Sequence, residues 1–236
     1  MKNLKFLSKI KQVGFTLIEV IVTIGISSIV MLGAIAIYVN TVRDNVSILD
    51  QIKLNYSLQN SLNLMVSHIR RAGYWSNAQS QIFNPSVKNP FMTTSSVAAN
   101  NTAITVYNSG TISSTGNCLL FAYNLSSSST LPSIGSNPDD RFGFRLNNGV
   151  IQYRVPSSDF SCTGASSSWE NITDPNKVTV DALIFTEDNN QVSVGNGDYY
   201  TVKSFDIQIT AHLTNNSNIS LTISQKANTE TGIFTD

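Results

Sequence analysis

Residues 11–20, KQVGFTLIEV, begin the apolar segment that decides the fold of this 236-residue chain. From Phe15 to Val42 the only charged residue is Glu19. A helix needs about 20 apolar residues to cross the hydrocarbon core of a bilayer. The run therefore predicts a membrane-spanning helix at residues 15–42.

Basic residues precede this segment and none follows it closely. Four lysines stand before it, no acid does, and the next basic residue is Arg43. Positive charge is retained on the cytoplasmic side of a membrane, so we expect a cytoplasmic N-terminus. Everything after about residue 42 is then expected in the periplasm, with the span in the inner membrane. The four lysines are Lys2, Lys5, Lys9 and Lys11.

The acid near the start of the span separates three kinds of N-terminal signal. Ala34-Ile35-Ala36 offers a small-x-small site, so a cleaved secretory signal is one interpretation, and a permanent anchor is a second. Glu19 disfavours both, because an acid in an apolar membrane segment is costly unless it has a function and a partner. The third interpretation is a prepilin signal.

Gly14-Phe15 and Glu19, with the basic leader and the apolar run, resemble the signal of type IV prepilins and pseudopilins. The resemblance implies that a prepilin peptidase cuts between Gly14 and Phe15 and methylates the new amine of Phe15. It also implies that Glu19 pairs with the Phe15 amine of a neighbouring subunit during assembly. The alternative is that Glu19 only complements the positive end of its own helix.

An amphipathic pattern continues the helix beyond the membrane. No proline occurs before Pro85, and Gly73 after Arg70 and Arg71 is a typical helix end. We expect one unbroken helix over residues 15–71, with an apolar face at Val42, Val46, Leu49, Leu58, Leu62, Met65 and Ile69. The sequence RRAGY at 70–74 resembles PilW-type minor pilins, and pseudopilin J is similar.

Short β-rich runs occupy the rest of the chain, separated by Ser, Asn, Gly and Pro clusters. Asn148-Gly149 predicts a type I′ hairpin, and residues 215–218 are expected to join the last two strands. Sequential strands with short turns predict an antiparallel sheet, covered by the amphipathic helix face. The fold class is therefore α+β, as in type IV pilins. The expected strands are 103–107, 118–123, 141–146, 150–155, 178–186, 201–213 and 219–225. Residues 76–100, 126–130 and 164–168 are expected as loops.

The chain has two cysteines, Cys118 and Cys162. Outside the cytoplasm they can pair, which would stabilise the fold by roughly 2–4 kcal/mol. Two unpaired thiols are the alternative.

The sequence contains few of the residues that catalytic and metal-binding sites require. His68 and His212 are the only histidines, too few for a multi-histidine site. Asp139-Asp140 and the acid-rich residues 187–198 offer oxygen ligands, but no spacing matches a calcium-binding EF-hand loop. We expect no enzymatic activity and no cofactor. Removing residues 1–14 takes four of the 15 basic side chains and leaves 15 acidic ones, so direct nucleic-acid binding is not expected.

These features predict a leader at 1–14, a membrane and polymerisation half-helix at 15–42, an amphipathic half at 43–73, and an extracytoplasmic domain at 74–236. The predicted function is a minor type IV pilin in pilus assembly or initiation, at the tip or in a priming complex. Twitching motility, adhesion and DNA uptake are roles that such a pilus serves. Its partners would be other pilin subunits, the prepilin peptidase and the inner membrane. The alternatives are a minor pseudopilin of type II secretion and a membrane-anchored, unpolymerised adhesin.

Overall fold

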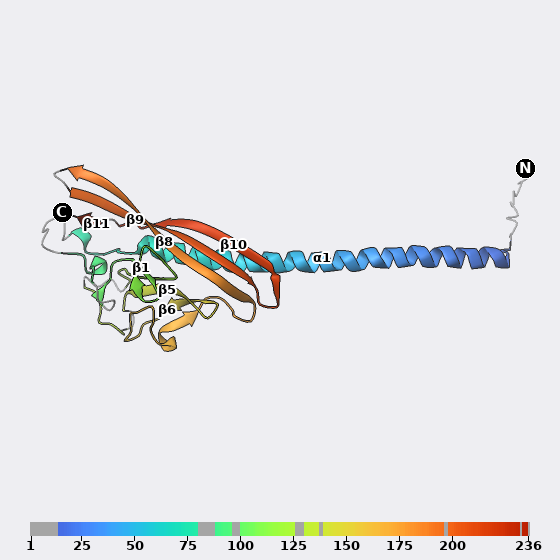
Figure 1. Cartoon of the computed structure of the whole chain (residues 1–236), viewed down its shortest axis with the longest axis horizontal. Helices are drawn as coiled ribbons and strands as arrows, with labels where there is room; N and C mark the ends of the chain where they lie inside the picture. Colours follow the sequence, from blue (N-terminus) through green and yellow to red (C-terminus); the bar gives the residue numbers. More distant parts are fainter. Residues whose placement is uncertain are drawn as a thin grey trace, which may run out of the picture. The chain divides into compact units, whose positions relative to one another are not determined.

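The computed structural model describes residues 14–79, 88–95, 100–125, 130–136, 139–195, 198–231 and 233–235 (Figure 1). It contains one long N-terminal helix followed by antiparallel β-sheets, which confirms the α+β fold class. The chain divides into two compact units, Met1–Leu49 and Asp50–Asp236. The leader, residues 1–13, lies outside the described residues.

Helix α1 spans Leu17–Arg71 without a break, as the absence of proline predicts. It ends where the sequence predicts, because Gly73 adopts a φ of +78°, which favours glycine. The Gly73 amide then donates to the Ala122 carbonyl at 2.8 Å. A Cβ at this position would lie 2.8 Å from Sδ of Met92. The glycine therefore both ends the helix and ties it to the domain.

The first sheet has six strands in the order β2-β1-β4-β5-β6-β7, all paired antiparallel. Asn148 and Gly149 have φ values of 49° and 76°, so the predicted two-residue hairpin between β5 and β6 is confirmed. The strands are β1 (Thr105–Asn108), β2 (Thr111–Ile112), β4 (Cys118–Ala122), β5 (Arg141–Asn147), β6 (Val150–Arg154) and β7 (Trp169–Asn171).

A second sheet of five strands follows, in the order β10-β9-β8-β3, with β11 also pairing β9. The sequence pattern predicts one sheet and does not separate these two. The acid-rich residues 187–195 belong to β8, although the pattern ends that strand at 186. The last hairpin turns at Thr214 and Asn215, earlier than predicted. The strands are β3 (Thr115–Gly116), β8 (Val178–Gly195), β9 (Asp198–Leu213), β10 (Asn216–Asn228) and β11 (Ile233–Thr235).

Both sheets pack against the C-terminal part of α1 in one hydrophobic core. On the helix the buried positions are Leu54, Leu58, Ser61, Leu62, Met65, Val66 and Ile69. The sequence pattern predicts that this buried face begins at Val42, but the structure differs: Val42, Val46 and Leu49 are 42%, 52% and 54% exposed. These three belong to the Met1–Leu49 unit, and no described residue covers them.

In the described parts of the predicted loops, 3₁₀ helices lie at Pro90–Met92 (η1), within residues 76–100, and at Ser166–Ser168 (η3), within residues 164–168. Of the predicted loops, residues 80–87, 96–99 and 126–129 lie outside the described residues.

Candidate functional site

Gly14 and Phe15 lie just before α1, and both are exposed. An ideal Cβ on Gly14 has no atom within 4 Å, and Phe15 is 84% exposed. The peptide bond between them is therefore open to an enzyme that approaches the isolated chain.

Glu19 lies in the first turn of α1 and contacts Thr16. Its Oε2 accepts hydrogen bonds from the Thr16 amide at 3.1 Å and from Thr16 Oγ1 at 3.0 Å. In return the Glu19 amide donates to Thr16 Oγ1 at 3.4 Å. This reciprocal arrangement is a capping box, which satisfies amides at the helix start. Among the described residues, the hydrogen bonds to the Glu19 carboxylate all go to Oε2, so Oε1 remains available as an acceptor.

Thr16 is a further residue of this site, and the charge and hydropathy pattern of the sequence does not single it out. The Thr-x-x-Glu spacing ahead of an apolar run is itself a capping-box signal. The assembly charge and the helix-dipole role expected of Glu19 both concern its carboxylate alone and require no partner at Thr16.

The first half of α1 presents apolar side chains to its surroundings on every side. Large apolar residues from Phe15 to Ile52 have exposed fractions of 40% to 84%. Among the described residues, α1 is the one helix that is long and apolar enough to cross a membrane, with a mean hydropathy of 2.5 in its most apolar window. Together with the motif at Gly14–Glu19, this surface supports membrane anchoring.

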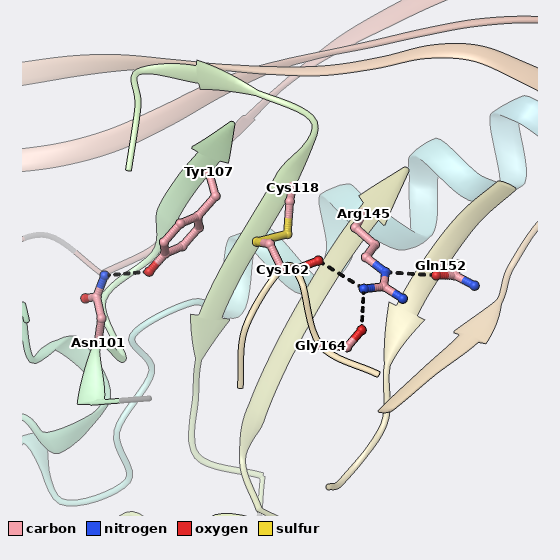
Figure 2. The surroundings of a disulfide bond; sticks show 7 residues. All are labelled: Asn101, Tyr107, Cys118, Arg145, Gln152, Cys162 and Gly164. Atoms are coloured by element: carbon pink, nitrogen blue, oxygen red, sulfur yellow. Dashed lines mark hydrogen bonds between the residues drawn. A yellow bond between two sulfur atoms is a disulfide. The ribbon is translucent and has the colours of Figure 1, made fainter. Parts of the chain in front are cut away.

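The two cysteines are joined by a disulfide in the Asp50–Asp236 unit (Figure 2). Cys118 lies on β4, and Cys162 lies in the connection between β6 and β7. Arg145 holds the same connection, because its Nη1 donates to the carbonyls of Cys162 and Gly164 at 3.0 and 2.9 Å. Its guanidinium also lies 4.4 Å from the ring centre of Trp169. The disulfide and Arg145 together thus fix the connection between β6 and β7, which has little regular structure of its own.

The two histidines have protein partners. His68 is surrounded by the rings of Tyr123, Phe142, Phe144 and Tyr153, and its Nδ1 lies 3.0 Å from the Tyr123 hydroxyl. Burial lowers the pKa of His68, and the charge of Arg71 lowers it further. His212 Nδ1 lies 2.9 Å from Asp181 Oδ2.

Four of the acidic residues that the sequence offers as calcium ligands, Asp139, Asp140, Glu187 and Asp188, have protein partners. Glu187 pairs with Lys203 and Asp188 pairs with Lys226. Asp139 is bound by the guanidinium of Arg154, and Asp140 accepts from the side-chain amide of Asn124 and from the backbone amide of Leu125. Within the described ranges, no group of three or more His, Cys, Asp or Glu residues is arranged to hold a metal ion.

Two protein families match the sequence. The family described as "Prepilin peptidase-dependent protein B" matches residues 47–229, and the "Prokaryotic N-terminal methylation motif" matches residues 11–35. The second match contains Gly14, Phe15 and Glu19. No curated protein and no solved structure matches the chain.

Proposed function

The chain belongs to the family of prepilin peptidase-dependent protein B, a pilin-like family, and on this premise we propose that it is a minor type IV pilin. It takes part in building a pilus, at the tip or in the complex that primes assembly. One observation carries the proposal: Gly14, Phe15 and Glu19 stand at the open start of an apolar helix, inside the match to the methylation motif.

Processing is the first step of the proposed function. The prepilin peptidase cuts between Gly14 and Phe15 and methylates the Phe15 amine. Gly14 suits the cut because it has no side chain to obstruct the approach of the enzyme. The leader holds the bond at the cytoplasmic face, since its four lysines resist transfer across the membrane.

Assembly is the second step, and Glu19 directs it. The methylated Phe15 amine of one subunit pairs with the carboxylate of Glu19 on its neighbour. Both charges are costly in lipid when alone, so their pairing favours correct docking over other alignments of the helices. The capping contacts of Glu19 do not compete, because they occupy Oε2 and leave Oε1 for the incoming amine.

The proposed location follows from the same elements. The precursor spans the inner membrane once through the first half of α1, with residues 74–236 in the periplasm, and the assembled protein lies in the extracellular pilus. The disulfide between Cys118 and Cys162 supports this placement, because disulfides persist outside the cytoplasm. Pilin-like families are structural, and the role proposed for this chain requires no catalysis.

The test is to delete the protein in cells that carry its pilus machinery, and to restore it as the full-length chain. We expect few or no pili without it, and a small amount of the processed protein in the sheared filament fraction after restoration. Normal pili with the protein confined to the membrane would contradict the proposal and favour an unpolymerised anchor. Normal pili combined with a secretion defect would instead identify a pseudopilin.

A further inference from the structure

One sheet edge in the Asp50–Asp236 unit differs from the others. The strands β2, β3 and β7 end their sheets with two or three residues each, and such short edges give another chain little to pair with. Because β3 pairs only with Phe185 and Thr186, the outer side of β8 is also largely unpaired, but β3 interrupts it and it carries the charges of Asp181, Glu187 and Asp188. The edge strand β10 has 13 residues. Its inner side pairs with Ser204–Leu213 of β9, and β11 pairs with the same strand further along, at Tyr199–Thr201. No described residue pairs with the outer side of β10.

The sequence of β10 lacks most of the protection that long edge strands carry. Residues 216–225, NSNISLTISQ, contain no charge and no proline. Lys226 follows, but its ammonium is paired with Asp188 Oδ2 at 2.6 Å. The one irregularity is a register shift between Asn216 and Ser220. A long uncharged edge exposes a row of backbone donors and acceptors that can template another strand.

Apolar side chains adjoin this edge. Leu221 and Ile223 on β10 are only partly buried against the core. A groove next to them is lined by Gln51, Leu54 and Asn55 of α1 and by Asn218–Leu221 of β10. Ile52 lies three residues before Asn55 and four before Tyr56, so it neighbours both on the helix surface. Ile52 and Tyr56 are 58% and 70% exposed. A strand added to the outer edge of β10 would cover this apolar surface with the face that it turns toward α1.

We propose that the outer edge of β10 binds an extended, uncharged segment of a different pilin-like subunit, which adds to the sheet as a further strand. Backbone hydrogen bonds along β10 supply the attachment. The bound segment carries apolar side chains at every second position, because alternate residues of a strand face the same side. Those side chains lie in the groove and against Ile52 and Tyr56. The inference rests on the proposed function, which supplies the neighbouring subunit.

The direction of β10 argues against a second copy of this chain as the occupant. Asn218–Leu221 lie beside Gln51–Asn55, and the Glu230 amide just after β10 donates to the Arg70 carbonyl at 3.0 Å. The strand therefore runs in the same direction as residues 51–70 of α1 (Figure 1). A symmetric pair of copies joined through β10 would be antiparallel, and its two helical segments would then point in opposite directions. Subunits anchored through their N-termini in one bilayer need these segments parallel.

Photocrosslinking of the full-length protein in piliated cells tests the proposal. The photoreactive residue p-benzoylphenylalanine replaces the exposed Ser220 on β10 or, as a matched control, the exposed Glu170 on the short edge strand β7. We expect a crosslinked product with another pilin-like subunit from position 220 only. Mass spectrometry of the product identifies the partner and the crosslinked segment, which should be extended and uncharged.

A charge on the edge should remove this product. Ser224→Lys places a lysine on the outer strand, whereas Gln208→Lys places one on the same exposed face of β9, directly opposite in the register. We expect loss of the crosslink with Ser224→Lys and its retention with Gln208→Lys. A product between two copies of this chain, equal products from positions 220 and 170, or no product at all would overturn the proposal.

The sheared filament fraction of the same cells separates this inference from the proposed function. Normal incorporation without a crosslink from position 220 refutes only the role of β10. Absence of the protein from filaments of otherwise normal pili refutes the pilin function, whatever the crosslinking shows.

Discussion

Arg154 binds Asp139 through two parallel hydrogen bonds in the interior of the domain. Nη1 lies 3.0 Å from Oδ1 and Nη2 lies 2.9 Å from Oδ2, and the two side chains are 0% and 1% exposed. The remaining donors of Arg154 reach the carbonyls of Arg141, Ser157 and Asp159. A fully satisfied buried pair of this kind joins strand β6 to the segments before β5 and after β6.

Removing one member of this pair should destabilise the domain strongly. Asp139→Ala leaves the Arg154 charge buried without a partner, so we expect the free energy of unfolding to fall by about 3–5 kcal/mol. Urea unfolding of the full-length protein in detergent, followed by tryptophan fluorescence, measures the change. The matched control is Lys177→Ala, which breaks the exposed pair with Asp174 and should leave stability nearly unchanged. A small effect of Asp139→Ala would contradict the prediction.

The disulfide should contribute substantially to stability. It closes a loop with a sequence separation of 44 residues, and loop entropy then predicts a loss of roughly 4 kcal/mol when both cysteines become alanine. The same unfolding experiment measures this loss. Arg145→Lys is the companion variant, because it keeps the disulfide but cannot reproduce the two bonds that Nη1 makes to Cys162 and Gly164. If both thiols of unreduced, exported protein react with an alkylating agent, the pairing is absent.

Mass analysis of the purified mature protein should show a chain that begins at N-methylated Phe15. Cells without the prepilin peptidase should retain residues 1–14. A mature chain that starts after Ala36 would instead identify an ordinary secretory signal.

Two substitutions of Glu19 separate assembly from helix capping. Glu19→Gln keeps a side chain suited to the capping box with Thr16 but loses the charge, whereas Glu19→Val loses both. If charge pairing directs assembly, both variants should be cleaved and inserted normally, and both should be depleted from sheared filaments. Blots of the membrane and filament fractions measure this. Recovery of incorporation by Glu19→Gln alone would assign Glu19 to capping and remove the charge-pairing mechanism.

His68 should make the stability of the domain depend on pH. Burial lowers its pKa below the ordinary value of 6.5, so the unfolded chain binds a proton more readily than the folded one. The contribution of neutral, buried His68 to the free energy of unfolding is therefore complete above about pH 6.5. It is lost as the pH falls through the lower pKa of the folded state. His68→Phe should flatten this part of the stability profile, and His212→Gln should retain it. A slope unchanged by His68→Phe would exclude this assignment.

Local signals in the sequence were sufficient wherever one or two residues dictate the backbone. Asn148-Gly149 and Gly73 are such cases, because a positive φ at these positions favours glycine and asparagine over other residues. The apolar first part of α1 was equally predictable, since a single acid stands in a long apolar run.

Other features depend on partners that lie far away in sequence. Residues 187–190, Glu-Asp-Asn-Asn, have low strand propensity, yet they pair with Val202–Phe205 of β9. A salt bridge of 2.7 Å between Lys203 Nζ and Glu187 Oε1 stabilises this extension of β8. Helical periodicity places Val46 and Leu58 on the same apolar face and predicts that both are buried. Only Leu58 is buried in the core, against the sheets, whereas Val46 is exposed. The pattern shows which residues share a face but not what covers that face.

The capping box at Thr16 and Glu19 has a consequence for maturation. Every atom that forms it lies on the C-terminal side of the proposed cut, so the start of the helix does not depend on the leader. The proposed cleavage would therefore leave the helix end unchanged and alter only the electrostatics there. Four lysines would depart, and one new amine would appear at Phe15, one residue before the cap. The precursor and the mature subunit would thus differ in charge at an end whose geometry is already in place.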